Sequence, residues 1–380
     1  MSQAFIQDRV SEAHIMVVGC GALGNEVLKN LVLMGARHLV VVDFDVVEAD
    51  NLTRSVLFSI DDARHQRQKA IVAAERLREM NPAVEVTPIC GDIAYDIGLG
   101  LVRRMDVVIG CVDSRWARYC INRLCMRAGK PWVDGGIDQL EGTVRVFAPG
   151  KNCYACNLGT EGRRDLMRRM PCSGIIRRNV MAGKVPTTSI VASVIGAVQV
   201  QEALKLLHRD ALAEGTLTSL CGKIFYYEGE HLTSRLADFQ AYDDDCAEHD
   251  CWMPVVASPL TTGNTVKEVL DWIGERDVTF CLGDDCFVDY VTARSDNARV
   301  SIMKPGRDVA AMVESHPLLR GIPFSGLYQH EWSEINAKFP YQEMTLRQLG
   351  IPDEGVLHVL TPQRDFFIEL KTEQKPQYAS

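Results

Sequence analysis

A glycine-rich turn and an acidic residue after it have the spacing of a nucleotide-binding site. The turn reads Gly19-Cys20-Gly21-Ala22-Leu23-Gly24 and lies between a predicted strand and a predicted helix. Glycines permit a tight turn there and allow a phosphate to approach the N-terminus of the helix. Asp43 stands at the end of the next predicted strand, where a carboxylate accepts hydrogen bonds from ribose hydroxyls. The pair predicts an adenosine nucleotide site, and an NAD-dependent oxidoreductase would fit these residues equally well.

The charged and polar residues that follow favour a different reaction from hydride transfer. They are, in chain order, Asp45, Asn51, Arg54, Lys69 and Asp113, followed by Arg118 and Asn122. A dehydrogenase has no need for this series. Arg54 or Lys69 alone would be interpreted as a solvated surface charge, and only its place in this order beside the glycine turn argues otherwise. NAD-dependent oxidoreductase therefore stays only as an alternative.

The order GxGxxG, DxD, NLxR, Lys and a strand-end Asp resembles the ubiquitin-activating superfamily, which includes the sulfur-carrier adenylyltransferases. The resemblance covers residues 14 to about 254. It implies adenylation, with ATP and Mg²⁺ as cofactors and, as partner, a ubiquitin-like protein with a free C-terminal carboxylate. The chemistry agrees with this implication, because a carboxylate that attacks the α-phosphate of ATP needs cations to screen the charge and a metal ion to hold pyrophosphate as it leaves. It places Asp43 at the ribose, Asn51, Arg54 and Lys69 at the phosphates, and Asp113 at Mg²⁺, with Arg54, Lys69 and Asp113 acting in catalysis. The other residues that it implies at the nucleotide are Gly19, Gly21, Gly24 and Asp45.

The sequence departs from the family pattern in two places. Ser55 stands where the family's NLxRQ motif has glutamine. Family members that act alone carry an N-terminal helix whose arginine reaches the ATP of the neighbouring protomer, and this sequence begins too late to contain it. Arg9 is a poor substitute. We therefore expect a homodimer, or a heterodimer with a related subunit that supplies the arginine; the alternative is a site that works without it.

Two pairs of cysteines have the spacing of a structural zinc site. Cys153 and Cys156 are separated by two residues, and Cys246 and Cys251 by four. Each pair is short enough for both sulfurs to reach one ion, and four thiolates suit tetrahedral Zn²⁺. With every position filled by protein, such a site would stabilise the fold as a clip. Buried thiols are the alternative interpretation, and Cys281 with Cys286 forms a competing pair.

Cys172, in the segment RRMPCSGII, is the candidate nucleophile. The C-x₂-C and C-x₄-C combination, with a cysteine ahead of VPTTSIVASVIGAVQVQEALKLL, is most similar to the compact activating enzymes of ubiquitin-fold modifier. In those enzymes the thioester cysteine lies shortly before a Pro-Thr-Thr, and Cys172 is the matching residue. Nearby cations stabilise thiolate over thiol. The cations around it are Arg163, Arg164, Arg168, Arg169, Arg177 and Arg178.

The basic segment has two other interpretations, a solvated loop or a surface that grips an acidic partner. Cys221 is the next candidate for the nucleophile. The remaining cysteines in or beside predicted strands and helices are interpreted as small buried hydrophobic residues. They are Cys20, Cys90, Cys111, Cys120 and Cys125.

The elements that would position these residues alternate between strand and helix. Strands are predicted at 14–19, 38–45, 84–89, 105–111, 132–133, 142–147 and 223–227, with helices through residue 34, at 61–80 and after Pro186. This order predicts an α/β fold, a Rossmann-like doubly wound mixed sheet with a zinc clip. We assign residues 1–254 to an adenylation domain that contains a catalytic-cysteine loop at 160–185. Residues 255–380 are predicted to form a smaller α+β domain, interpreted as a ubiquitin-fold-like docking domain or, alternatively, as a dimerisation or substrate-holding domain.

Composition narrows the class of protein. The chain has 380 residues and a net charge of −9, which gives no reason to expect nucleic acid or an anionic membrane as partner. The N-terminus has no signal-peptide pattern, and the apolar run at 190–207 is interrupted by polar residues, so we expect a cytoplasmic protein with a buried helix. The leading hypothesis is activation of a ubiquitin-like protein with transfer to a conjugating-enzyme cysteine. Adenylation of a sulfur-carrier protein or peptide without a thioester is the alternative.

Overall fold

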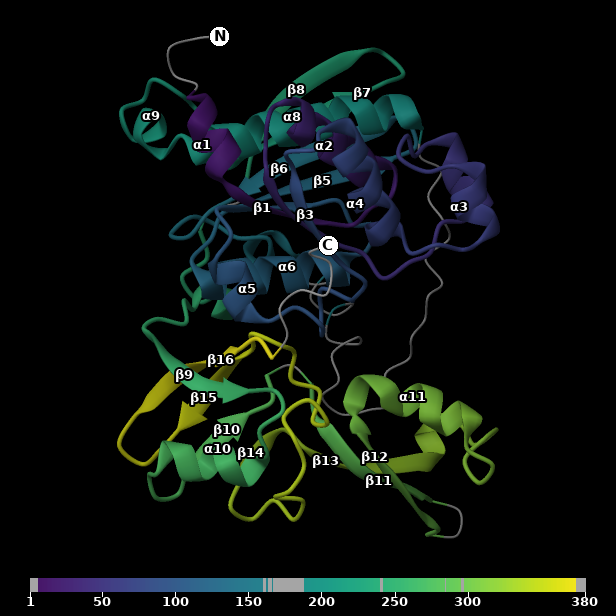
Figure 1. The fold of residues 1–380 in the computed structure, drawn as a ribbon, viewed down its shortest axis with the longest axis vertical. Coiled ribbons are helices and arrows are strands. Elements are labelled where there is room, and N and C mark those ends of the chain that lie inside the picture. The colour runs from purple at the N-terminus through teal and green to yellow at the C-terminus, as the bar shows by residue number, and fades with distance from the viewer. Residues whose placement is uncertain are drawn as a thin grey trace.

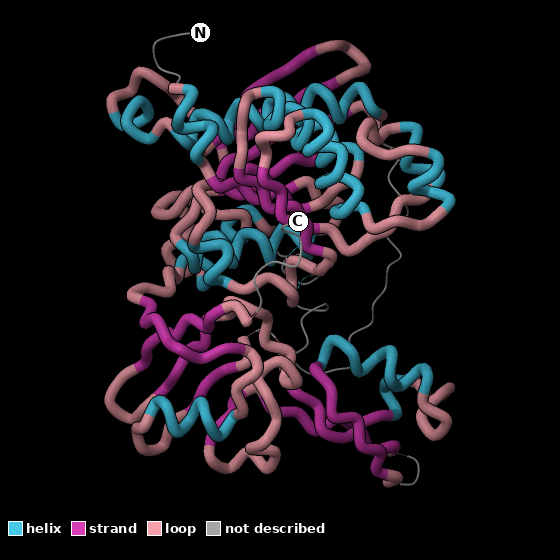
Figure 2. The backbone as a smooth tube through the Cα atoms, viewed as in Figure 1, coloured by secondary structure: helices cyan, strands magenta, loops and turns pink. Residues whose placement is uncertain are grey.

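The computed structural model describes residues 6–159, 162, 166, 188–239, 242–283, 285–294 and 297–373. Its strands form a large mixed sheet in the first part of the chain and two smaller sheets after residue 254 (Figures 1 and 2). The predicted α/β class and doubly wound sheet are confirmed, as is a further α+β part at the C-terminal side. The division at residue 254 into two domains stays a prediction.

The large sheet has the strand order β3-β2-β1-β4-β5-β6-β7-β8. The pairs from β3 to β5 are parallel and those from β5 to β8 are antiparallel. The central strands are rich in Val and Ile because both of their faces are covered. The strands are β1 (His14–Val18), β2 (His38–Val42), β3 (Glu85–Ile89), β4 (Val107–Gly110), β5 (Trp132–Asp138), β6 (Glu141–Phe147), β7 (Lys223–Glu228) and β8 (Thr233–Asp238).

Helices cover both faces of this sheet (Figure 1). One hydrophobic core lies beneath α2, α4 and α8, and the other lies towards α5 and α6. The helices of this part are α1 (Gln7–Glu12), α2 (Ala22–Leu33), α3 (Ile60–Arg64), α4 (Lys69–Met80), α5 (Leu99–Arg103), α6 (Arg115–Ala128), α8 (Ser189–Leu207) and α9 (Arg209–Ala213), with 3₁₀ turns η1 (Ala49–Thr53), η2 (Ala155–Asn157) and η3 (Ala247–His249).

The helix predicted at 61–80 is in fact two helices, α3 and α4. Gln66 has a φ of 45°, which breaks the right-handed helix. Gln68 then pairs with Val46 in an isolated β-bridge, and the amide of Lys69 donates to the carbonyl of Asp45 at 2.9 Å. This extended connection places the start of α4, and therefore Lys69, beside the segment that follows β2.

Helix α8 is long and apolar enough to cross a membrane by length and composition alone. In the fold it packs against α2, β5 and β6. Gln199 and Glu202 on this helix are buried, and the Gln199 side-chain amide donates to the Gly110 carbonyl at 2.9 Å. The polar residues that interrupt the apolar run are therefore part of the packing of a core helix.

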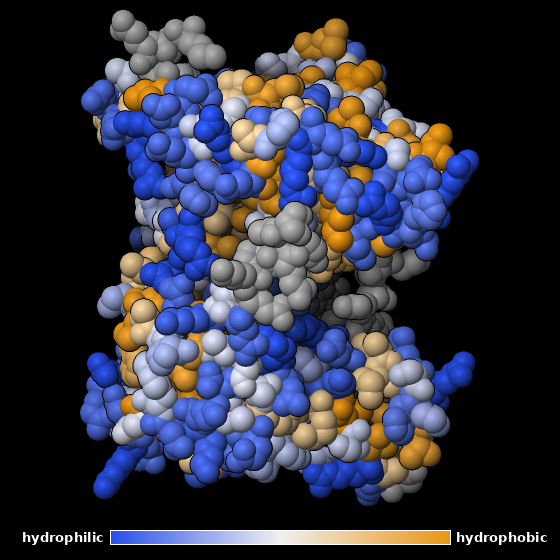
Figure 3. Space-filling view, in the orientation of Figure 1, coloured by the Kyte–Doolittle hydropathy of each residue, from blue (hydrophilic) through white to orange (hydrophobic). Residues whose placement is uncertain are grey.

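The C-terminal part contains a five-stranded sheet, ordered β14-β10-β15-β16-β9, and a three-stranded sheet, ordered β12-β11-β13. Helix α10 accompanies the first sheet and α11 the second (Figure 1). Figure 3 shows hydrophilic residues over much of the visible face of both parts of the chain. The elements are β9 (Val255–Thr261), α10 (Val266–Ile273), β10 (Thr279–Cys281), β11 (Phe287–Ala293), β12 (Arg299–Pro305), α11 (Gly306–Ser315), η4 (Phe324–Gly326), β13 (Leu327–Trp332), β14 (Glu334–Asn336), β15 (Val356–Leu360) and β16 (Asp365–Lys371).

Candidate functional site

The glycine turn links β1 to α2, and two of its glycines are required by space. Gly19 has a φ of +97°, and a Cβ there would come within 2.5 Å of the Cys111 carbonyl oxygen. A Cβ on Gly24 would lie 1.9 Å from the Gly19 carbonyl oxygen. Around Gly21 a Cβ would meet nothing within 4 Å, and no side chain caps the first amides of α2. The turn therefore leaves backbone N–H groups open at a helix N-terminus, which is the arrangement that binds phosphate.

Asp43 ties this turn to the end of β2. Its carboxylate accepts hydrogen bonds from the Cys20 amide at 2.6 Å and from the Asp45 amide at 2.8 Å. Burial raises the pKa of Asp43, although Lys69 and the two amides oppose that shift. A carboxylate held beside the glycine turn in this way is placed to accept hydrogen bonds from the hydroxyls of a ribose.

The predicted phosphate-binding cations are held by carboxylates of their own chain. Lys69, the first residue of α4, places its Nζ 2.8 Å from Asp45 Oδ2. Arg54 turns back on η1, where its Nη1 donates to the Asp50 carbonyl at 2.8 Å and its Nη2 lies 3.6 Å from the Asp50 carboxylate. A nucleotide phosphate would therefore take the place of a carboxylate at each cation.

Asn51 organises the turn that carries Arg54. Its Oδ1 accepts from the Glu48 amide at 3.0 Å, and its Nδ2 donates to Asp50 at 3.0 Å. Sequence reasoning assigned Asn51 to phosphate, and in the structure its side chain holds the backbone of η1.

Asp113 follows β4 and is exposed, directly before Ser114, which caps the N-terminus of α6. The strands β2, β1 and β4 are adjacent and parallel, so residues after their carboxyl ends share one edge of the sheet. This edge brings together the glycine turn, Asp43 and Asp113, as the sequence order implied.

Asn25 is a positioning residue that sequence reasoning missed. It is fully buried, and its Nδ2 donates to the carbonyls of Cys20 at 2.7 Å and Gly21 at 3.0 Å. Its Oδ1 accepts from the Leu57 amide at 2.8 Å. Asn25 therefore fixes the glycine turn against the segment that follows Arg54. A polar residue on the buried side of a helix was the only signal in the sequence.

A second candidate site contains Cys153, Cys156, Cys246 and His249, whose ligand atoms all lie within 4.8 Å of one another. The Cys153 sulfur is 3.8 Å from the sulfurs of both Cys156 and Cys246, and the Cys156 sulfur is 3.1 Å from His249 Nε2. A tetrahedral zinc ion with Zn–S bonds of about 2.3 Å would set its sulfur ligands about 3.8 Å apart. The donor set and its spacing therefore fit structural Zn²⁺. Burial raises the pKa of Cys153 to about 12.

The structure differs from the sequence-based prediction at the fourth candidate zinc ligand. Cys251, predicted to be a ligand, is exposed, and its sulfur lies 3.6 Å from the Arg127 carbonyl. His249 takes its place because the 3₁₀ turn η3 returns a side chain three residues after Cys246 to the same side. After His249 the chain runs from the cysteine cluster to α6, where the Trp252 amide donates to the same Arg127 carbonyl at 2.9 Å. Cys246-x₂-His249 repeats the spacing of the first pair, and that signal was present in the sequence.

Cys172 and the arginines around it lie outside the described residues. Among the described cysteines, Cys20, Cys111 and Cys125 are buried, and burial raises the pKa of each. Burial also raises the pKa of Cys221. Cys281 and Cys286, the competing pair, are absent from any group of three or more metal-binding side chains in the described part of the chain.

Comparisons with known proteins agree with this geometry. The family profile described as the ThiF family matches residues 2–248. The adenylyltransferase and sulfurtransferase MOCS3 of Sus scrofa is 31% identical over 242 residues, which cover 63% of this chain and 49% of that protein. The SAMP-activating enzyme E1 of Haloferax volcanii is 31% identical over 238 residues, which cover 63% of this chain and 81% of that protein. The sulfur carrier protein adenylyltransferase of Thermus thermophilus is 33% identical over 207 residues, covering 53% and 71%.

Among solved structures, Escherichia coli MccB with succinimide superimposes with a TM-score of 0.52 at 22% identity, covering 64% of this chain and 68% of that one. This likeness shows the fold. The chain spans about half the length of the MOCS3 relatives that it matches.

Proposed function

Because this chain belongs to the ThiF family, within the ubiquitin-activating superfamily, we propose that it uses ATP and Mg²⁺ to adenylate the C-terminal carboxylate of a ubiquitin-like or sulfur-carrier protein. In this reaction a carboxylate oxygen bonds to the α-phosphorus, the bond to the leaving pyrophosphate breaks, and an acyl adenylate remains. Pyrophosphate carries the departing charge, which cations and Mg²⁺ stabilise.

The observation that carries the proposal is the set of groups at one sheet edge. In this proposal the amides at the start of α2 would bind the phosphates, Asp43 would bind the ribose, and Lys69 and Arg54, on the segments after β2, would screen the phosphate charge. Asp113 comes from the neighbouring strand. In this scheme ATP displaces Asp45 from Lys69, and Asp113 holds Mg²⁺. An oxidoreductase would have no use for the two cations.

ATP–pyrophosphate exchange tests this function. The acceptors to supply are the purified sulfur-carrier protein of Thermus thermophilus and the SAMP of Haloferax volcanii, since two relatives are named for activating such proteins. We expect acceptor-dependent exchange that Asp113→Ala abolishes, while Asp271→Ala, an exposed aspartate on α10, retains it. Normal exchange in Asp113→Ala would contradict the assignment of that residue.

We further propose that the Cys172 thiolate attacks the acyl carbon of the adenylate, so that the acyl–phosphate bond breaks, AMP leaves and a thioester forms. The cysteine of a conjugating enzyme then takes the acyl group and releases the Cys172 thiolate. The other cysteines named above support this proposal by comparison with Cys172, because the reactive form of a cysteine is the thiolate. Burial raises the pKa of Cys20, Cys111, Cys125 and Cys221 and so disfavours their thiolates. A covalent adduct seen by non-reducing mass spectrometry should be cleaved by dithiothreitol and absent in Cys172→Ala. Cys221→Ala is the matched control and should keep the adduct.

Activation of a sulfur-carrier protein without an enzyme thioester is the second candidate, favoured by the names of two of the relatives. It predicts exchange without any adduct on the enzyme. The same mass spectra therefore separate the two candidates.

The proposed partners include a second subunit. Arg9 Nη2 lies 2.5 Å from Asp210 Oδ2 on α9, so this arginine is engaged within its own chain. We propose that another copy, or a related subunit, supplies an arginine to the nucleotide, and that the reaction takes place in the cytoplasm. Light scattering should then give a mass above that of one chain, and a monomer with full exchange activity would contradict this partner.

A further inference from the structure

A buried carboxylate between two arginines lies beside the nucleotide edge. Asp134 on β5 is fully buried, and its Oδ1 accepts from Arg118 Nε at 2.9 Å. Its Oδ2 accepts from Arg145 Nε at 2.9 Å and from Arg145 Nη2. Arg118 comes from α6, and Arg145 comes from β6, where it is the direct cross-strand partner of Asp134. Three elements therefore converge on one carboxylate.

This Arg118–Asp134–Arg145 cluster is cationic. One arginine would neutralise Asp134, and the second leaves a net charge of +1, because guanidinium groups stay protonated in proteins. Burial lowers the pKa of Arg118, but the charge of Asp134 more than offsets this and the pKa is raised. Arg145 also lies over the ring of Tyr154, with 5.3 Å from its guanidinium carbon to the ring centroid. The Arg118 and Arg145 side chains are 13% and 21% exposed, so both reach the surface.

The cluster lies at the β5 and β6 side of the sheet edge, away from the strands that carry the groups assigned to the nucleotide. In the strand order, β2 and β1 supply Asp43 and the glycine turn, so the adenosine lies towards β2. The acyl group that attacks the α-phosphate must then arrive from the β5 and β6 side. Arg118 Nη2 donates to the Val112 carbonyl at 2.7 Å, which places the cluster next to Asp113.

Side chains fill the space beside the two glycines that follow Asp134. A Cβ on Gly135 would lie 2.4 Å from the Gln199 side chain, and a Cβ on Gly136 would lie 3.1 Å from Thr143 Oγ1 and 3.4 Å from Arg118 Nη2. The glycines therefore let Arg118 lie against the backbone of β5, where its Nη2 also donates to the Gly135 carbonyl at 3.2 Å.

We propose that this cluster binds the terminal carboxylate of the acceptor protein, and that Arg145 selects a free carboxylate over other chain ends. One carboxylate oxygen accepts hydrogen bonds from the guanidinium, and the other attacks the α-phosphate. Asp134 is a positioning residue, because it fixes the planes of both guanidinium groups. The inference rests on the proposed function, since it assumes that the acceptor presents a carboxylate to ATP.

Fluorescence polarisation with paired peptides tests the proposal. The probes are labelled peptides with the carboxyl-terminal residues of the Thermus sulfur-carrier protein and of the Haloferax SAMP, each made with a free carboxylate and with a carboxamide. The wild type should bind the carboxylate form in preference to the amide. Loss of a charge-assisted hydrogen bond in Arg145→Gln should weaken carboxylate binding by about 10- to 100-fold and leave amide binding unchanged.

Two further variants keep the test independent of folding. Arg145→Lys retains the charge and should keep part of the preference for carboxylate. Arg235→Gln removes an arginine that also lies over a tyrosine, Tyr226, on the outer strands β7 and β8, and should bind like the wild type. Equal affinity of the wild type for carboxylate and amide, or no binding of the carboxylate peptides, overturns the proposal whether or not Arg145→Gln folds.

Exchange assays separate this proposal from the proposed function. If the wild type catalyses ATP–pyrophosphate exchange and folded Arg145→Gln has an unchanged KM for the acceptor, the cluster does not bind the carboxylate, while the proposed adenylation is retained. In the opposite outcome, the wild type shows no exchange with any acceptor but binds carboxylate peptides selectively, and Arg145→Gln abolishes that selectivity. This result would refute adenylation and would leave the cluster as a carboxylate-binding site. The KM for ATP should stay unchanged in Arg145→Gln, whereas a general structural defect would alter it as well.

Discussion

The choice between His249 and Cys251 as the fourth zinc ligand is the sharpest prediction at the candidate metal site. The change to make is His249→Ala, compared with Cys251→Ser as the matched variant. Structural zinc contributes about 10–16 kcal/mol in small zinc domains, so each of four ligands accounts for about 3 kcal/mol, or about a hundredfold in affinity. We expect His249→Ala to lose this much affinity and Cys251→Ser to lose none, because only His249 lies in the cluster.

The assay measures zinc per protein chain by atomic emission, followed by titration with a chromogenic chelator. The wild type should carry one zinc per chain, and its removal should lower the thermal midpoint, because the clip joins the segment after β6 to the segment after β8. Cys153→Ser provides the positive control for metal loss. Zinc release from Cys251→Ser with zinc retention in His249→Ala would refute the assignment of His249, since the chain would then close around the ion with four sulfurs.

Three other predictions concern the framework of the site. Asn25→Ala removes three hydrogen bonds from a fully buried side chain, so the free energy of unfolding, measured by chemical denaturation, should fall by about 2–4 kcal/mol, and ATP affinity should fall with it. An unchanged denaturation midpoint would contradict the role of Asn25 in fixing the glycine turn. Burial raises the pKa of Asp62, but hydrogen bonds from Ser59 and Arg67 bring it below its usual value. The stabilisation from ionised Asp62 is therefore complete above about pH 4 and is lost as the pH falls through the lower pKa of the folded state. The free energy of unfolding, measured from neutral to acidic pH, should fall less steeply in Asp62→Asn than in the wild type. Glu369→Gln weakens the ion pairs with Arg103 and Arg104, and because these groups are partly exposed the free energy of unfolding should change by at most about 1 kcal/mol, while hydrogen exchange of β16 should rise; identical exchange would show that the pairs do not hold the two parts together.

Much of the nucleotide edge could be predicted because its signals are local. Gly24 leaves room for the Gly19 carbonyl within a single β-turn-α unit, the φ of +97° at Gly19 favours glycine, and Asp43 follows the next strand directly. The break between α3 and α4 could not be predicted, since it depends on a bridge from Gln68 to Val46, a residue on a different segment. Helical periodicity on both sides of the break concealed it.

Long-range contacts explain what the sequence did not disclose. The Cys246-x₂-His249 spacing is visible in the sequence, but only the proximity of His249 to Cys153 and Cys156 in the fold selects it over Cys251 as a ligand. Arg118 belongs to the ordered series of polar residues in the sequence, whereas Asp134 and Arg145 each resemble an ordinary charge there, and only the fold brings the three together from three elements. The sheets of the C-terminal part also depend on distant pairing, because the first strand, β9, is parallel to the last, β16.

The C-terminal part is joined to the first by a continuous set of contacts, and this bears on where an acceptor can approach. The Gly100 amide donates to the Glu354 carbonyl at 2.8 Å, and a Cβ on Gly100 would lie 2.7 Å from that oxygen. Trp252 lies between the guanidinium of Arg127 and the ring of Phe367.

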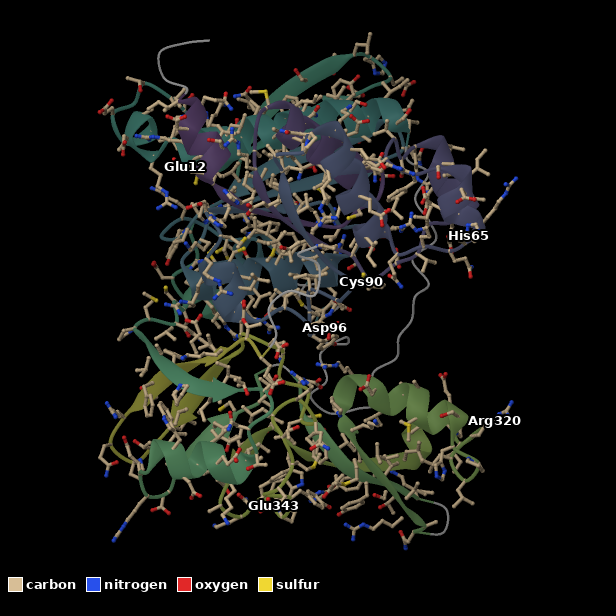
Figure 4. All side chains as sticks on the ribbon, viewed as in Figure 1. Glu12, His65, Cys90, Asp96, Arg320 and Glu343 are labelled. Carbon is tan, nitrogen blue, oxygen red and sulfur yellow. The ribbon has the colours of Figure 1, made fainter. Side chains whose placement is uncertain are left out.

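One of these contacts reaches the loop after β3. Arg307 at the start of α11 lies 3.8 Å from Asp96, which Figure 4 labels at the junction of the two parts. The contacts therefore extend from α5 and α6 to a loop on the β3 side of the nucleotide edge. Among the described residues, these contacts form a fixed wall on the β3 side of the nucleotide edge, and the proposed carboxylate site at Arg145 lies on the opposite side, towards β5 and β6.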